Sequence, residues 1–140
     1  MLVNKTFLLF LISIGFALFV GSGGYGFGID FYDEYYKPNF MKGDFRELLS
    51  WRIATLTVYN FHIGVYLTSF ILAISTGLLL KKTTNHYFKK NNWLFFLLFI
   101  LLIHTWPIIM STSNAMRQGI SMSFLFLSIY FLLSGCTKIS

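Results

Sequence analysis

The length of the charge-free apolar segments constrains this chain more than any other feature. Asp, Glu, Lys and Arg are absent from Ile53 to Leu80 and again from Asn91 to Met116. A helix needs about 20 mostly apolar residues to cross the hydrocarbon layer of a bilayer. Only 11% of the 140 residues are charged, whereas about 25% is usual in soluble domains. The sequence therefore predicts an all-α, polytopic membrane protein.

The apolar segments predict about four transmembrane helices in one membrane domain that covers residues 1–140. The first segment, 6–22, also resembles a signal peptide, but without a clear cleavage site a retained span is favoured. Further spans are expected at 58–80, 93–110 and 115–134, with a break in the third near Pro107. An outer loop would then cover residues 23–57, and a cytoplasmic loop would cover residues 81–92.

The distribution of charge predicts the orientation of the spans. All five acidic residues lie between Asp30 and Glu47. The segment 81–90 has no acid and contains four lysines, namely Lys81, Lys82, Lys89 and Lys90. Short basic loops stay in the cytoplasm, so we expect both termini to be cytoplasmic as well. The net charge of +6 comes with no nucleic-acid-binding motif, so a nucleic-acid partner is not expected.

The predicted outer loop opens with glycines and continues with tyrosines and carboxylates. Gly21, Gly23, Gly24, Gly26 and Gly28 follow no predicted strand, so they favour a sharp backbone bend over a phosphate-cradling loop. Asp30, Tyr32 and Tyr35 come next. Such tyrosines anchor a chain at the membrane surface or, with carboxylates beside them, bind sugars. From Asp44 onward, the spacing of apolar residues predicts an amphipathic helix on the outer surface.

The last apolar segment has two distinct sides when it is drawn as a helix. One side is a polar stripe formed by Asn114, Arg117, Ser121 and Ser128, with Gln118 at its margin. A different side carries Ala115, Gly119 and Ser123, whose small size lets another helix approach closely.

Arg117 is the single charge in this segment, and we expect it near the start of the helix, after caps at Ser111–Asn114. The helix macrodipole is already positive there, which disfavours a cation. A phosphate-like anion would relieve this, because the guanidinium and the free N–H groups would both bind it. Alternatively, Arg117 extends into the outer lipid headgroups.

The remaining candidates are weaker. His104 lies within the third span, where it is either functional or a neutral, hydrogen-bonded side chain. The scattered histidines and the single cysteine, Cys136, make neither a metal site nor an internal disulfide, and no cofactor is expected.

The segment Ser113–Ser121 resembles the arginine–glutamine motif of EpsG-like proteins, the bacterial Wzy-type polymerases of exopolysaccharide, capsule and O-antigen. Gly28–Asp30, followed by Tyr32, Tyr35 and Tyr36, is similar to that family's glycine–x–aspartate element with trailing tyrosines. The order of spans, loops and motifs also fits. Since members of the family have more spans, the resemblance implies that this chain corresponds to the amino-terminal portion and is too short to act alone.

The resemblance implies polymerisation of oligosaccharide repeat units, carried on a polyprenyl diphosphate, at the outer face of the bacterial cytoplasmic membrane. Arg117 and Asp30 would be catalytic, while the substrate would be bound by Gln118, Asn114, Tyr32 and Tyr35. Membrane lipids and other polysaccharide-assembly proteins would be partners. The alternative is a small, non-enzymatic accessory subunit, which the small-residue face of the last helix suits equally well.

Overall fold

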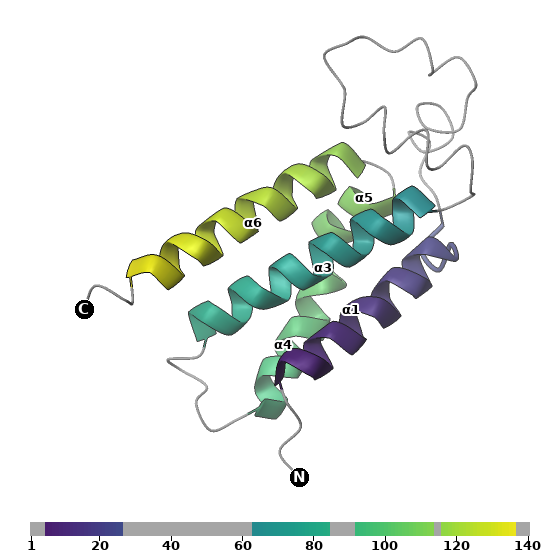
Figure 1. Ribbon diagram of the computed structural model, residues 1–140. Helices are drawn as coiled ribbons and strands as arrows, with labels where there is room; N and C mark the ends of the chain where they lie inside the picture. Colours follow the sequence, from purple (N-terminus) through teal and green to yellow (C-terminus); the bar gives the residue numbers. More distant parts are fainter. Residues whose placement is uncertain (1–4, 27–62, 85–91, 114–115, 137–140) are drawn as a thin grey trace, which may run out of the picture.

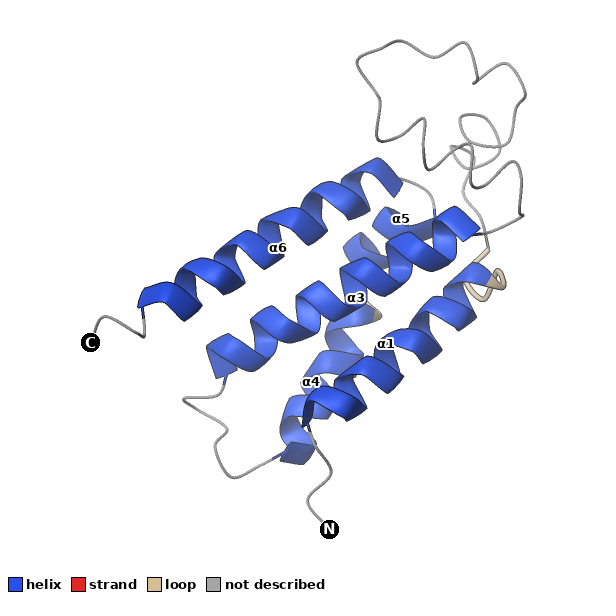
Figure 2. Ribbon diagram, in the orientation of Figure 1, coloured by secondary structure: helices blue, strands red, loops and turns tan. Residues whose placement is uncertain are grey.

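The computed structural model describes residues 5–26, 63–84, 92–113 and 116–136, and every regular element within these ranges is an α-helix (Figure 2). The helices are α1 (Lys5–Gly21), α3 (Ile63–Thr84), α4 (Asn92–Ile103), α5 (Trp106–Ser113) and α6 (Met116–Cys136). The all-α prediction is confirmed for this part of the chain. The amphipathic helix expected after Asp44 lies outside the described residues.

Helix α3 occupies the centre of the bundle. Helices α1 and α6 lie along its two sides, and α4 and α5 lie behind it (Figure 1). Close packing at the centre depends on Gly77 of α3, where an added Cβ would come within 2.9 Å of side-chain atoms of both Leu9 and Phe99. Helices α1, α3 and α4 therefore converge at this glycine, and Leu9 and Phe99 are fully buried beside it.

The bundle exposes large apolar side chains on its surface, and its interior contains small polar side chains among the buried apolar ones. Phe124, Phe131 and Leu132 are 62%, 65% and 69% exposed. Among the described residues, the buried polar side chains all carry hydroxyl groups: Ser13, Thr68, Ser69, Ser75, Thr76, Ser111, Thr112 and Ser123. Small and hydroxyl-bearing residues are typical of the interfaces between membrane helices, and lipid solvates the apolar surface around them.

Two helices among the described residues are long and apolar enough to cross a membrane: α3, with 22 residues, and the stretch Gln118–Gly135 of α6. The bent pair α4–α5 adds a third if it forms one span. Helix α1 is shorter, since its 17 residues extend about 25 Å at 1.5 Å per residue. The structure thus supports two to three candidate spans where the sequence predicted about four.

A break divides the third apolar segment into α4 and α5, whose axes are bent by 59°. The break falls at His104 and Thr105, slightly before the position predicted from Pro107. Proline lacks an N–H and its ring clashes with the preceding helical turn, but it is well suited to the first turn of a new helix. Side chains satisfy part of the broken backbone, because the hydroxyl of Thr105 donates to the carbonyl oxygen of Leu102 at 2.8 Å.

Helix α1 ends in the glycine-rich turn, as expected. Gly23 and Gly26 adopt φ angles of 87° and 74°, in the left-handed region that favours glycine. The N–H of Gly23 donates to the carbonyl oxygen of Val20, and the N–H of Gly24 donates to that of Phe19. The backbone therefore turns away from the helix axis immediately after Gly21.

Helix α3 continues past its predicted end. Lys81 and Lys82 were expected in the cytoplasmic loop 81–92 but lie in the last turn of the helix, and Asn92 already belongs to α4. Two effects extend α3. Lysines near a helix C-terminus complement its macrodipole. In addition, the hydroxyl of Thr84 donates to the carbonyl oxygen of Leu80.

Candidate functional site at the start of α6

Helix α6 begins at Met116, so Arg117 is its second residue and lies in the first turn, as the sequence predicts. The expectation that Ser111 and Thr112 cap this helix is wrong, because both residues belong to α5. The hydroxyl of Thr112 donates to the carbonyl oxygen of Ile109, at 2.8 Å, within α5 itself. The cap of a helix is the residue directly before its first turn, and both residues lie at least four positions before Met116, inside α5.

The packing face of α6 contains Gly119 and Ser123, as the small-residue spacing predicts. A Cβ at Gly119 would collide with the backbone carbonyl oxygen of Ser111 and come within 2.8 Å of the Thr68 methyl group. Ser123 is 2% exposed, and its hydroxyl donates to the carbonyl oxygen of Gly119 at 2.7 Å. The absence of a side chain at Gly119 therefore lets the first turns of α6 lie directly against α3 and α5.

The described members of the polar stripe lie on the exposed side of α6. Gln118, Ser121 and Ser128 are exposed, in contrast to the buried Gly119, Ile120 and Ser123. Gln118 is adjacent to Arg117 in the first turn, so the arrangement offers an amide side chain beside the start of the helix. The first N–H groups of a helix have no intrahelical acceptor, which makes this turn suited to binding an anion.

Buried hydroxyl groups lie along α3 and α5, and those of Thr68 and Ser111 are next to this turn of α6. Thr68 of α3 contacts Gly119, and the hydroxyl of Ser111 donates to the sulfur of Met122 at 3.4 Å. Within the part of the chain that the structure describes, the hydroxyls of Thr68, Ser69 and Thr76 are buried without a hydrogen-bond partner. Sequence reasoning missed this group, although hydroxyl residues in the middle of an apolar span are the signal that reveals it.

His104 lies at the break between α4 and α5, where its Nδ1 is 2.7 Å from the carbonyl oxygen of Ile100. Since a carbonyl oxygen can only accept, Nδ1 carries the hydrogen. The ring also makes edge contacts with Phe16, at 5.6 Å between centroids, and with Tyr25, at 6.1 Å. The hydrogen-bonded alternative for His104 is thus the one that these contacts favour.

The other predicted site residues are not brought together by the described part of the chain. Asp30, Tyr32, Tyr35 and Asn114 lie outside it, and for Arg117 only the backbone is described. Across the described ranges, no three His, Cys, Asp or Glu side chains gather in a way that could hold a metal ion.

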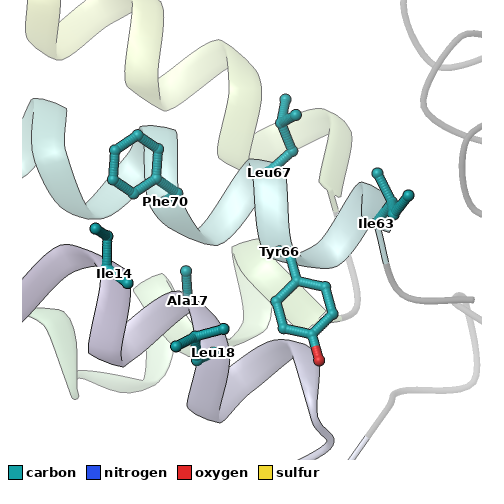
Figure 3. Close-up of a pocket in the computed structure, with 7 residues that line it drawn as sticks. All are labelled: Ile14, Ala17, Leu18, Ile63, Tyr66, Leu67 and Phe70. Carbon is teal, nitrogen blue, oxygen red and sulfur yellow. The ribbon is translucent and has the colours of Figure 1, made fainter.

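An apolar groove of about 390 Å³ runs between α1 and α3 (Figure 3). Its lining consists of Ile14, Ala17, Leu18, Ile63, Tyr66, Leu67 and Phe70. The phenol oxygen of Tyr66 is the one side-chain polar atom among these residues, and it points toward the end of α1 (Figure 3). The groove therefore suits hydrocarbon and offers little that would select one apolar occupant over another.

Comparisons of the chain with models of known protein families, with curated proteins and with solved structures find no match.

Proposed function

We propose that this chain takes part in polymerising polyprenyl-diphosphate-linked oligosaccharide repeat units at the outer face of the bacterial cytoplasmic membrane. The observation that carries the proposal is the position of Arg117 as the second residue of α6, within the segment Ser113–Ser121 that resembles the arginine–glutamine motif of EpsG-like polymerases. A guanidinium and unpaired N–H groups in one helical turn form a suitable binding site for a diphosphate.

The proposal includes four membrane crossings, with α1 as the first. Helix α1 runs beside α3 over most of its length. The Lys81 ammonium donates to the Thr6 hydroxyl at 2.7 Å near one end, and the ring of Tyr66 packs against Gly21 near the other. Helix α3 is long enough to span a membrane. Because α1 lies beside α3 from Lys81 to Tyr66, it would cross most of the same membrane thickness. Both termini would then be cytoplasmic, and the start of α6 would face outward.

In the proposed chemistry, Arg117 binds the diphosphate and stabilises the negative charge that develops on the leaving group. Gln118 supports this contact from the same turn of the helix. By the family resemblance, Asp30 acts as the base or as a sugar ligand, Tyr32 and Tyr35 line the path of the sugar, and Asn114 contributes to substrate binding. The close contact of Gly119 with α5 holds the start of the helix in place.

The test replaces Arg117 in the native gene and measures the amount and length of the polymer in its host. Arg117→Ala should reduce polymer formation about 100- to 1000-fold, the usual effect of removing one group that stabilises transition-state charge. Arg117→Lys should recover only part of the activity, because an ammonium cannot form the bidentate contact. Ser128→Ala, on the same exposed stripe of α6, is the matched control and should leave the polymer unchanged. Normal polymer length in Arg117→Ala, with normal membrane insertion, would rule out the proposed role.

One observation favours the second candidate, a non-enzymatic accessory subunit. Gln118 and Ser128 place polar groups, beside Ser121, on the exposed side of α6, and a partner helix that covers this side would form hydrogen bonds with them. A photocrosslinker at position 128 should then capture a second membrane protein, while Arg117→Ala leaves the polymer intact.

A further inference from the structure

The bundle has a short side, formed by α1 and α4, and a long side, formed by α6. Helices α1 and α4 contain 17 and 12 residues, which extend about 25 Å and about 18 Å at 1.5 Å per residue. The stretch Gln118–Gly135 of α6 extends about 27 Å over its 18 residues. The two short helices are neighbours, because Leu9 of α1 and Phe99 of α4 both lie against Gly77 of α3. A lipid beside the short side therefore meets a shorter apolar surface than a lipid beside α6.

The two ends of α1 limit the length of its apolar surface. At one end, the Lys81 ammonium donates to the Thr6 hydroxyl at 2.7 Å, so a charged group lies level with the second residue of the helix. At the other end, the chain leaves the helix in the glycine-rich turn. Between them, in residues 7–20, the one polar side chain is Ser13, which is fully buried. The apolar surface of α1 is therefore about 20 Å long, whereas the hydrocarbon layer of a typical bilayer is about 30 Å thick.

Two exposed tryptophans bound the apolar surface of the neighbouring helix. Trp93, in the first turn of α4, is 76% exposed, and α4 begins beside the start of α1 (Figure 1). Trp106, the first residue of α5, is 71% exposed, and its near neighbour His104 contacts the ring of Tyr25 in the turn after α1. The two tryptophans thus lie near opposite ends of α1, at most about 20 Å apart along the chain axis. Because tryptophan rings concentrate between hydrocarbon and headgroups, this separation also indicates a thin hydrocarbon layer.

We propose that the short side of the bundle binds phospholipids whose chains are shorter than those of an average bilayer. A helix that is shorter than the hydrocarbon layer thins the bilayer or makes its flanking side chains extend to the headgroups, at a cost that grows with the mismatch. Short-chain lipids avoid this cost. They would contact the exposed apolar side chains of α1 and α4, among them Phe7, Leu18 and Leu101. The proposal rests on the membrane crossings included in the proposed function, but it does not depend on the polymerase chemistry.

The test measures, for the full chain in vesicles, which phosphatidylcholine binds beside each side of the bundle, from the quenching of a single tryptophan by brominated lipid. Trp93 or Trp106 is kept alone, with the other two tryptophans replaced by Phe, and reports on the short side. Chains of 14 carbons should bind there about fivefold more tightly than chains of 18 carbons. The matched control is Phe131→Trp without other tryptophans, because position 131 is an exposed position of α6. This control should show no preference for the shorter chains.

Two results would overturn the proposal: equal binding of the two lipids beside Trp93 and Trp106, or the same preference beside Phe131→Trp. If Phe131→Trp fails to fold, Phe124→Trp, at another exposed position of α6, is the control. Bromines near the headgroup should quench both natural tryptophans more strongly than bromines at the chain ends. The opposite result for Trp106 would place it in the middle of the bilayer and contradict the crossing by α4 and α5 as well. None of these measurements reads polymer formation, so the polymerase chemistry is tested separately.

Discussion

At the scale of single residues, two glycines determine how closely the helices approach. Gly77 makes room for the side chains of Leu9 and Phe99, whereas Gly119 lies against the backbone carbonyl of Ser111. A side chain can rotate away from an added methyl group, but a backbone carbonyl in a packed helix cannot. The contact at Gly119 is therefore the less tolerant of the two, and it is the one that holds the first turns of α6.

We predict that Gly119→Ala lowers the free energy of unfolding by about 1–3 kcal/mol, the usual cost of overpacking. Gly135→Ala is the matched control in the same helix, because a Cβ there meets nothing within 4 Å. That variant should be neutral or more stable by up to about 1 kcal/mol, since alanine is the better helix former. Unfolding in mixed detergent micelles measures both variants, and equal stability of the two would contradict the packing at Gly119.

At the scale of elements, the break between α4 and α5 redirects the chain toward α6. The axes differ by 59°, and the break is accompanied by Pro107 and by hydrogen bonds from Thr105 and His104 to the carbonyl oxygens of α4. Because α5 packs against Gly119, its direction fixes the position from which α6 starts.

Replacing Pro107 with Ala should reduce the bend, because the N–H of the new residue can continue the helical hydrogen-bonding pattern. Spin labels at positions 93 and 110, in a Cys136→Ser background, report the change. The distance between them should increase by a few ångströms as the two helices align, given a rise of 1.5 Å per residue. An unchanged distance would show that the side-chain hydrogen bonds, and not the proline, determine the bend.

At the scale of the whole molecule, the sequence predicted features that depend on one segment alone, but it did not predict which helices pack against each other. Charge-free apolar stretches located the helices, Pro107 predicted a break, and the spacing of Gly119 and Ser123 predicted the packing face. The central position of α3 was not predictable, because the apolar segments are similar in composition. Which helices pack together depends on contacts such as those of Gly77 with Leu9 and Phe99. The end of α3 beyond Lys81 and the inclusion of Ser111 in α5 also depend on hydrogen bonds that composition does not reveal.

The proposed topology and the proposed chemistry both require α6 to begin on the outer side of the membrane. Gln118→Cys and Thr83→Cys, each in a Cys136→Ser background, place a thiol at an exposed position near the start of α6 and near the end of α3. A membrane-impermeant maleimide should label Gln118→Cys in intact spheroplasts and Thr83→Cys only after lysis. Labelling of Gln118→Cys only after lysis would put Arg117 on the cytosolic side and contradict both the topology and the proposed chemistry.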